Sequence, residues 1–368
     1  MKEFSKYLTR DRQKRKNLSD ILYYIVEKQE TTRREIERET GFSWGTVSES
    51  VAELIASGYI REETAQDRNV GRNASILKIN GDAVVSIGID MNISGVTARV
   101  VGFDLSKKYV ISMPFAAQTQ EQVLLQTREI CREALHWCAD RYRVLSIGIA
   151  YQGNVDVKNG ISLRFPQIPD WKPVSVREMI EEEFGIFTLL EHDPKSLLFA
   201  KTVKQRIKDA VLLRVDKGIG LSVIQDGKIL NDSGKMELGH TIAVRDGARC
   251  TCGKRGCLEA YASIRGIEKR ENRDFESVCA QPDGAAFEEA AALFATALHN
   301  VCMLFAPEKI ILTGDMIVQE TQFTQPMIRS FRQLEGEEQT QIEIDHNISA
   351  SYGVAVQALK EAIRKNMI

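Results

Sequence analysis

Ligands that zinc prefers are concentrated in the stretch ELGHTIAVRDGARCTCGKRGCLE, residues 237–259. The stretch holds one imidazole and three thiols, those of His240, Cys250, Cys252 and Cys257. Thiolates and neutral imidazoles are the usual ligands of four-coordinate structural zinc, and four of them leave no open position for a reacting water. Ordinary buried cysteines are the alternative, but so dense a group of soft ligands favours a metal. The sequence therefore predicts a structural zinc ion and not a hydrolytic one.

The spacing of these residues also resembles a motif of a known protein family. The chain reads Glu-x-Gly-His at 237–240 and Cys-x-Cys-Gly-x-x-Gly-Cys-x-Glu at 250–259. Both patterns occur in the ROK family, named for its repressors, open reading frames and kinases, and every motif position is filled here. The resemblance runs over nearly the whole chain, because a DNA-binding segment precedes the sugar-binding part, as in the family's repressors.

The resemblance implies a sugar pocket between two lobes. The family's kinases form it from an Asn-Asp pair, the Glu and His of the first motif, and the Glu that ends the second. The pair aligns with His192-Asp193, so the implied sugar ligands are Asp193, Glu237, His240, Glu259 and His192. Carboxylates accept hydrogen bonds from hydroxyls, and an imidazole can bind zinc through one nitrogen and a hydroxyl through the other. A carboxylate at a helix start, before Pro194, is the alternative for Asp193 alone.

A kinase also needs a site for the triphosphate, and the sequence departs from the kinase pattern there. The family's kinases carry Asp-x-Gly-Gly-Thr in the first hairpin, where residues 90–94 read Asp-Met-Asn-Ile-Ser. A second turn, Gly-Gly-Gly in the kinases, ends here in Asp315, whose carboxylate would repel a triphosphate. The glycines of Gly218-Ile219-Gly220 are retained, but two glycines alone are weak evidence of phosphate binding. We therefore expect no sugar phosphorylation and no catalytic residue.

The first 80 residues have the pattern of a winged helix-turn-helix. Apolar residues repeat at intervals of three and four over 18–26, which predicts an amphipathic helix. A short helix capped by Thr31 or Thr32 and ended by Gly41 precedes a second one capped by Ser43. Two strands joined by a polar loop follow, as in a wing. Helix, glycine turn, helix and wing together predict a DNA-binding head.

The exposed side of the second of these helices and the wing loop supply the candidate DNA contacts. Short polar groups can approach bases and phosphates, and loop arginines can enter a minor groove. The candidate DNA-binding residues are Ser43, Trp44, Thr46, Ser48, Glu49, Arg68 and Arg72. A helical hairpin that makes protein contacts is the alternative. The basic segment 4–16 is either a solvated arm or an arm that contacts phosphates.

Strands and helices alternate after residue 81. Three β-rich runs, a long helix over about 119–140 and the strand VLSIGIAY indicate an α/β fold, and later segments predict helices over about 285–304 and 352–364. The family resemblance implies a two-lobed ribonuclease-H-like, actin-type ATPase fold. We therefore expect two domains, a winged helix-turn-helix over 1–80 and a sugar-binding and dimerisation domain over 81–368.

Composition excludes several classes of protein. No apolar run approaches the ~20 residues of a membrane span, and no apolar segment follows the charged start as it would in a secretory signal. Four of the seven cysteines are scattered outside the zinc motif, which fits a reducing cytosol and not a disulfide framework. Residues 1–80 carry a net charge of +2 and the remainder −4, so the head is the more suited to nucleic acid. We expect a cytoplasmic protein without membrane insertion.

These features predict a sugar-responsive transcriptional regulator, a repressor of carbohydrate-utilisation genes. Its expected partners are a double-stranded DNA operator, a sugar or sugar phosphate effector and a second copy of itself, as a dimer or a tetramer. An ATP-dependent sugar kinase with a DNA-binding head is the first alternative, which the loss of the paired glycines after Asp90 disfavours. A regulator controlled by a sugar-transport protein is the second, and the intact Glu237, His240 and Glu259 argue against the vestigial sugar pocket that it implies.

Overall fold

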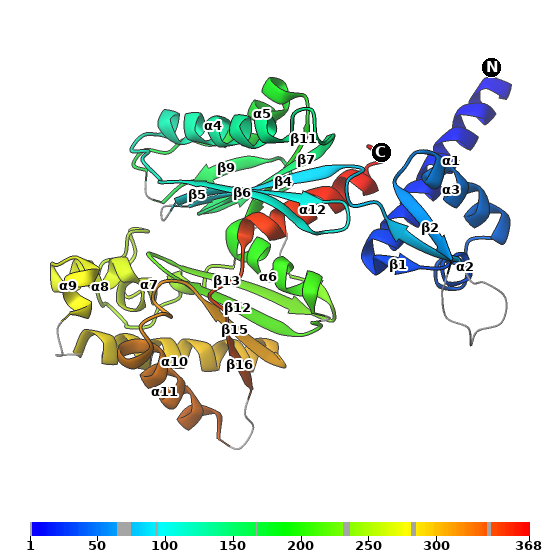
Figure 1. Ribbon diagram of the computed structural model, residues 1–368. Coiled ribbons are helices and arrows are strands. Elements are labelled where there is room, and N and C mark those ends of the chain that lie inside the picture. Colours follow the sequence, from blue (N-terminus) through cyan, green and yellow to red (C-terminus); the bar gives the residue numbers. More distant parts are fainter. Residues whose placement is uncertain are drawn as a thin grey trace. The chain divides into compact units, whose positions relative to one another are not determined.

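The structure is a computed structural model that describes the chain except for residues 1, 65–74, 93–94, 167, 206, 231–235, 281–284 and 337–339. The chain forms two compact units, the first of residues 1–191 with 351–368 and the second of residues 192–350 (Figure 1). The first unit is therefore discontinuous in sequence, and the end of the chain returns to it. Among the described residues, no helix is long and apolar enough to cross a membrane.

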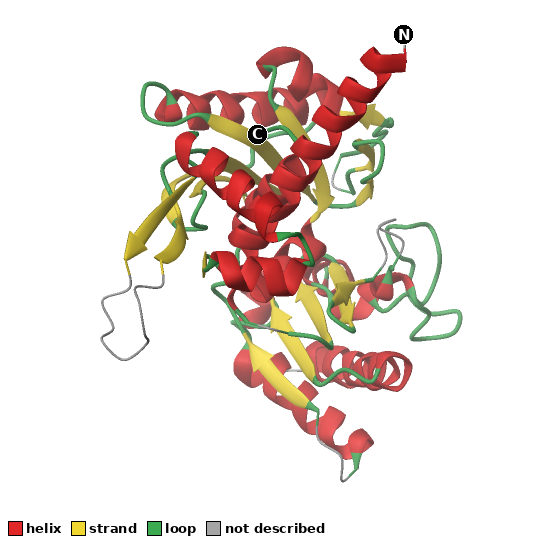
Figure 2. Ribbon diagram, turned by 90° about the vertical axis from the view of Figure 1, so that its right-hand side faces the viewer, coloured by secondary structure: helices red, strands yellow, loops and turns green. Residues whose placement is uncertain are grey.

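The first unit begins with a head of three helices and three short strands. These are α1 (Lys2–Lys28), β1 (Glu30–Thr31), α2 (Arg33–Thr40), α3 (Trp44–Ala56), β2 (Ile60–Thr64) and β3 (Ser75–Ile79). The strands pair antiparallel in the order β1-β3-β2, and Figure 2 shows β2 and β3 side by side as a hairpin. The helix-turn-helix and its wing are as predicted. Helix α1 begins earlier than the periodicity over 18–26 indicated, so segment 4–16 is helical, and whether it contacts phosphates stays a prediction.

Local capping explains where the helices of the head begin and end. Thr32 and Glu35 form a reciprocal capping box at the start of α2, and Gly41 ends that helix with a left-handed φ of 73°. The side chain of Ser43 accepts a hydrogen bond from the backbone N–H of Thr46 and so caps α3. A side-chain cap satisfies an N–H that the helix itself leaves unpaired, and a left-handed residue costs glycine little. The short turn between α2 and α3 is thus encoded locally.

A five-stranded sheet forms the remainder of the first unit, in the order β11-β7-β4-β5-β6. Its elements are β4 (Val85–Asn92), β5 (Gly95–Gly102), β6 (Lys107–Met113), α4 (Gln120–Cys138), β7 (Val144–Tyr151), β8 (Asn154–Asp156), β9 (Ile161–Arg164), β10 (Val174–Ser175), α5 (Val176–Phe184), β11 (Phe187–His192) and α12 (Ala350–Arg364). Helices α4 and α5 cover one face of the sheet and α12 covers the other (Figure 1).

Successive residues of β4 and β7 point to opposite faces of this sheet, and the two faces differ in side-chain size. Ile87 belongs to the apolar core that α4 completes. Gly88 and Gly148 are register partners and belong to the opposite face, because successive residues of a strand alternate. A Cβ at Gly88 would lie 1.8 Å from the carbonyl oxygen of Ser351, and one at Gly148 would lie 2.2 Å from that of Val354. The paired glycines therefore let the backbone of α12 lie directly on the sheet.

The last turns of α12 also pack against the head. Ile25 of α1 and Val51 and Leu54 of α3 belong to one buried apolar cluster with Leu359 and Ile363 of α12. Burial of such side chains is the main source of folding free energy. The apolar core of the head therefore continues into α12.

Polar contacts accompany this apolar cluster. Lys360 Nζ lies 2.6 Å from a carboxylate oxygen of Glu27. Arg364 donates a hydrogen bond of 2.6 Å to the Tyr23 hydroxyl, and its guanidinium lies 4.4 Å from the centre of that ring. Both contacts join α12 to α1.

A second five-stranded sheet, in the order β14-β13-β12-β15-β16, organises the second unit. Its elements are α6 (Asp193–Lys204), β12 (Ala210–Val215), β13 (Ile219–Gln225), β14 (Lys228–Ile229), the 3-10 turn η1 (Leu238–His240), α7 (Glu259–Ala262), α8 (Ile264–Glu271), α9 (Phe275–Cys279), α10 (Ala285–Phe305), β15 (Lys309–Thr313), the π-helical turn η2 (Glu320–Thr324), α11 (Gln325–Glu335) and β16 (Gln341–Ile344). Strand β15 runs parallel to β12 and β16. Helices α10 and α11 cover one face and α6 lies on the other (Figure 1), so the predicted α/β architecture is confirmed.

Candidate functional site

The four predicted metal ligands converge in the second unit. His240 ends η1, and the three thiols follow in the loop that leads to α7. One ligand atom from each of the four residues lies within 4.8 Å of the others. Cys250 Sγ is 3.7 Å from His240 Nδ1, and Cys252 Sγ is 3.6 Å from Cys257 Sγ. Ligands of a tetrahedral zinc at the usual bond lengths lie roughly 3.5–3.8 Å apart, so this cluster has the dimensions to hold a metal ion.

Burial of these thiols affects their protonation. Cys250 and Cys257 are buried, and burial raises the pKa of both thiols above its ordinary range. A bound cation stabilises the thiolate form that burial disfavours. The nitrogen of His240 that faces Cys250 is Nδ1, which leaves Nε2 as the ring nitrogen outside the cluster.

Glu259 connects this loop to the sheet. It begins α7, and its Oε2 accepts a hydrogen bond of 3.2 Å from the backbone N–H of Ile219 at the start of β13. Its Oε1 accepts one of 3.3 Å from the Thr251 hydroxyl, between two of the candidate zinc ligands. One carboxylate therefore ties the candidate metal loop to β13.

Asp193 lies in a second polar cluster. It begins α6 and is only 4% exposed. Arg214, near the end of β12, donates from Nη1 to Asp193 Oδ2 at 2.9 Å and from Nε to the carboxylate of Asp216. The other oxygen of Asp216 accepts from the backbone N–H of Asp315, which follows β15. Three carboxylates and one guanidinium thus meet where two parallel strands end.

Burial dominates the electrostatics of this cluster. It raises the pKa of Asp193 to about 6, because the loss of water costs the carboxylate more than the Arg214 charge recovers, and Asp216 raises it further. Burial and the charge of Asp216 also raise the pKa of Asp315. The single guanidinium of Arg214 is shared by Asp193 and Asp216, so this edge of the sheet would repel further negative charge.

Two glycines in the segment 218–220 bring Asp193 and Glu259 to the same strand. A Cβ at Gly218 would lie 2.9 Å from Glu259 Oε2, and one at Gly220 would lie 2.5 Å from the ring of Pro194, next to Asp193. Residues two apart in a strand share a face. The retained glycines therefore allow α6 and α7 to approach β13 closely, a role that requires no phosphate.

Two other predicted sugar ligands, His192 and Glu237, each directly precede a helical element. His192 precedes α6, and its Nε2 lies 3.7 Å from Asp193 Oδ1. Glu237 precedes η1, where its carbonyl oxygen accepts a hydrogen bond of 3.0 Å from the backbone N–H of His240. His192 thus lies beside Asp193, and Glu237 begins the backbone turn that ends at His240.

Sequence reasoning missed Arg214 and Asp216. Both lie in the run AVLLRVDKGIG. The available signal was that two charged residues, Arg214 and Asp216, stand at the end of an apolar strand. A charge at the end of an inner strand needs a partner, and here the partner is Asp193.

The candidate DNA face lies on α3 and the wing. Ser43, Trp44 and Glu49 are exposed, and Thr46 and Ser48 are partly exposed. Val47 and Val51 on the opposite side are buried. Arg68 and Arg72 lie outside the described residues.

Two of these exposed side chains have partners of their own. The Arg34 guanidinium lies 4.8 Å from the centre of the Trp44 ring. Lys14 of α1 lies 3.1 Å from a carboxylate oxygen of Glu49 and 3.1 Å from one of Glu53. Lys14 of α1 thus lies beside α3 and pairs with Glu49, one of the candidate DNA-binding residues.

Comparisons with known proteins match both parts of the chain. The ROK family model matches residues 86–353, and the MarR family model matches residues 19–68. The xylose repressor of Bacillus spizizenii is 24% identical over 325 residues, which cover 83% of each chain. The DNA-binding transcriptional repressor Mlc of Escherichia coli is 26% identical over 268 residues, 70% of this chain and 65% of Mlc. The DNA-binding transcriptional dual regulator NagC of E. coli is 28% identical over 65% of this chain and 60% of its own.

Solved structures share the fold. A ROK family transcriptional regulator, described as a homolog of E. coli Mlc, superposes with a TM-score of 0.78 at 22% identity, over 96% of this chain and 97% of its own. A ROK family glucokinase from Streptomyces griseus, in complex with glucose and AMPPNP, gives a TM-score of 0.64 at 22% identity, over 75% of this chain and 99% of its own. The fold of the body is thus one that both regulators and sugar kinases use.

Proposed function

The chain belongs to the ROK family, and we propose that it is a sugar-responsive transcriptional regulator that represses carbohydrate-utilisation genes. The observation that carries the proposal is the order of the two family matches, MarR over 19–68 and ROK over 86–353, in a chain that aligns with 83% of a xylose repressor. A DNA-binding head and a sugar-binding body in one chain suit control of an operator by a metabolite. The coupling between them needs only about 1–3 kcal/mol.

The head binds operator DNA through α3 and the wing, with Ser43, Trp44, Thr46, Ser48, Glu49, Arg68 and Arg72 as the contact residues. A dimer of such heads prefers inverted repeats whose half-sites lie about one helical turn apart, or a multiple of it. Dimerisation resides in the body, residues 81–368, and the head comprises residues 1–80. Because its operator is chromosomal and its cysteines are unpaired thiols, the protein works in the cytoplasm.

The sugar is held by carboxylates and an imidazole. Asp193, Glu237 and Glu259 accept hydrogen bonds from its hydroxyls, His240 reaches it through Nε2, and His192 completes the set. The closeness of Glu259 and Pro194 to the same face of β13 supports a common site. Each hydroxyl that loses its partner in a buried site costs on the order of 1–3 kcal/mol.

Zinc is the structural metal of this body, bound by His240 and the thiols of Cys250, Cys252 and Cys257. When bound, it supplies charge that holds the thiolates and cross-links the loop. The loop also orients a sugar ligand, because the Thr251 hydroxyl donates a hydrogen bond to Glu259.

The protein does not phosphorylate the sugar. Asp216 and Asp315 support this, because both residues lie at the parallel ends of β12 and β15, and the guanidinium of Arg214 is already hydrogen-bonded to Asp193 and Asp216. A triphosphate at these strand ends would be repelled by the carboxylates, and the repulsion is stronger in a buried site because the dielectric constant is low. A sugar kinase with a DNA-binding head is the competing function, since a ROK glucokinase shares the fold.

One sample of full-length protein tests the proposal. Fluorescence anisotropy with DNA from the upstream region of its own operon should show binding that one sugar of a monosaccharide panel changes at least tenfold, the equivalent of about 1.4 kcal/mol. Glu259→Gln should weaken that sugar by about tenfold or more and keep DNA affinity. A coupled ADP-release assay with the same sugar, ATP and magnesium should stay at background. Turnover of about 1 per second, the low end for kinases, would establish a sugar kinase instead.

A further inference from the structure

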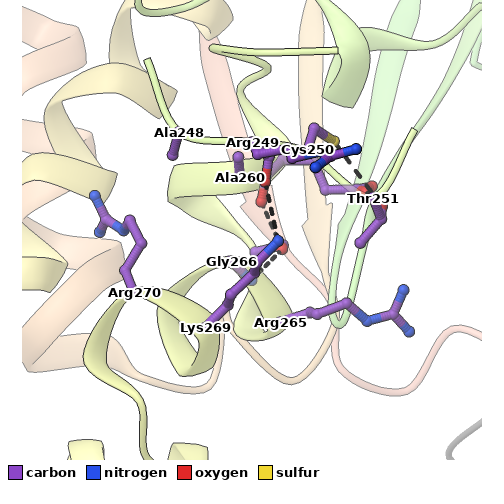
Figure 3. Close-up of a pocket in the computed structure, with 11 residues that line it drawn as sticks. Ala248, Arg249, Cys250, Thr251, Ala260, Arg265, Gly266, Lys269 and Arg270 are labelled. Atoms are coloured by element: carbon purple, nitrogen blue, oxygen red, sulfur yellow. Dashed lines mark hydrogen bonds between the residues drawn. The ribbon is translucent and has the colours of Figure 1, made fainter. Parts of the chain in front are cut away.

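A pocket lies beside the candidate zinc loop, within the second unit. Its volume is about 230 Å³, and its walls come from the loop around Cys250, from the start of α7 and from α8 (Figure 3). The side chains that matter are Arg249, Thr251, Glu259, Arg265, Lys269 and Arg270. Four of these six are basic and one is acidic, which is an unusual balance for a cavity of this size in a protein of net charge −2.

Most of this positive charge is not neutralised by the protein. Arg270 pairs with Glu289 and stacks on the Tyr261 ring at 4.9 Å, so its charge is already compensated. Lys269 donates a hydrogen bond of 3.3 Å to a backbone carbonyl, that of Arg249, which leaves its charge unpaired.

The two remaining arginines have no such compensation. Within the described part of the chain, no ion pair or side-chain hydrogen bond involves the guanidinium of Arg249 or of Arg265. The carboxylate of Glu259 already accepts from Ile219 and from Thr251. Glu259 is the one carboxylate in this lining, so three of the four cations line the pocket without an ion-pair partner among the described residues.

Helix geometry keeps two of these cations on one side. Arg265 and Lys269 are four residues apart in α8, so they lie on the same helix face. Figure 3 shows Lys269 between Arg265 and Arg270, beside the strand of loop that carries Arg249 and Thr251. Ser263 caps the start of α8, and the positive end of the helix dipole adds to the field.

We propose that this pocket binds a phosphate monoester, with Arg249, Arg265 and Lys269 as its ligands. Like charges that line one pocket repel one another, and a dianion removes that cost while it accepts charge-assisted hydrogen bonds. Guanidinium groups match the geometry of phosphate oxygens better than ammonium groups do. The ester is a sugar phosphate, a step that rests on the proposed function, whereas free phosphate is the other source of the same anion.

Occupancy of the pocket has a consequence for the candidate sugar ligands. The anion would join α8 to the loop that bears Cys250 and Thr251, and Thr251 donates to Glu259. It would thereby fix the loop on which Glu259 depends. Occupancy of the pocket should therefore strengthen sugar binding through Thr251 and Glu259.

The test is titration calorimetry on zinc-loaded full-length protein with inorganic phosphate, a hexose 6-phosphate and the unphosphorylated hexose. Arg265→Gln and Lys269→Gln should each weaken the binding of the phosphorylated ligand by about tenfold or more, as for loss of a hydrogen bond between charged groups. Arg245→Gln is the matched control, because it removes one charge from the same loop at a side chain that is 96% exposed and outside the pocket. It should change the affinity by less than about twofold.

The outcomes separate this inference from the proposed function. Inorganic phosphate that competes with the ester supports the pocket, and phosphate that binds as tightly as the ester identifies free phosphate as its ligand. No binding of either anion at millimolar concentration overturns the inference, as does wild-type affinity in Arg265→Gln, while unphosphorylated sugar that still binds leaves the proposed function intact. A loss of operator affinity in Arg265→Gln would assign the pocket to DNA phosphates instead. Zinc content and melting temperature of each variant show that it is folded.

Discussion

Glu259 and Asp193 are both carboxylates that we assign to the sugar, yet the chain holds them differently. Glu259 is partly exposed and accepts two hydrogen bonds from uncharged donors, Ile219 N–H and the Thr251 hydroxyl. Asp193 is buried, and its partner is the charged Arg214. The first depends on the candidate zinc loop, whereas the second depends on a buried ion pair. The difference implies that different perturbations disable the two ligands.

The largest expected effect is on the loop that supports Glu259. Cys257→Ser removes one of four ligands, and structural zinc contributes much of the folding free energy of such sites. Metal analysis should give about one zinc per chain in the wild type and far less in the variant, with a lower melting temperature of the body. Cys279→Ser, a free cysteine outside the cluster, is the control and should retain its zinc. Full zinc occupancy in Cys257→Ser would remove that residue from the ligand set.

The next effect should come from Arg214, which supports Asp193. Arg214→Met leaves two buried carboxylates, those of Asp193 and Asp216, without their cation. Loss of one partner from a buried ion pair typically costs about 3–5 kcal/mol, so urea unfolding should show a decrease of that order. Adding Asp193→Asn to the variant should recover part of the loss, because it removes one of the stranded charges. Equal stability of wild type and Arg214→Met would contradict a structural ion pair.

The smallest effect is on pH dependence, and it separates the two carboxylates most sharply. Because the pKa of Asp193 is about 6, its carboxylate is mostly protonated at pH 5 and should then lose about tenfold of sugar affinity relative to pH 7.5. Asp193→Asn should abolish this dependence, and Glu259→Gln should retain it. Calorimetry across this range tests it, with zinc content measured at each pH.

The raised pKa of Asp193 also predicts how the free energy of unfolding changes with pH. The folded pKa of Asp193, about 6, lies above the unfolded value of about 3.9, so the folded state binds this proton more tightly. Ionisation of Asp193 should therefore lower the free energy of unfolding as pH rises from about 4 to about 6. The Asp193→Asn variant should lack this component of the pH profile. An Asp193 contribution that rises over this interval would contradict the shift.

The sequence was most informative where partners are close along the chain. The four candidate zinc ligands fall within one short motif, and Thr32, Gly41 and Ser43 act within a turn of the helices that they cap. Such local chemistry can be read without knowledge of the fold. The α/β body and the winged head were predicted for the same reason, from periodicity and turns.

The polar cluster around Arg214 was not predicted, because its partners are distant in sequence. Arg214 binds Asp193 across 21 residues, and Asp216 binds the N–H of Asp315 across 99. Only the parallel pairing of β12 with β15 brings those strand ends together. The Gly218-Ile219-Gly220 segment shows the converse problem. From the sequence alone its glycines were only weak evidence of phosphate binding, because their packing against Glu259 and Pro194 depends on tertiary structure.

The contribution of α12 to the core of the head limits how far the two parts can be exchanged between proteins. Leu359 and Ile363 pack with α1 and α3, and Lys360 and Arg364 bind side chains of α1. A chimera that receives a foreign head without the last turns of α12 would bury mismatched side chains at this junction. Construction of hybrid regulators from this chain should therefore transfer α1–β3 and residues 350–364 together, although they lie at opposite ends of the gene.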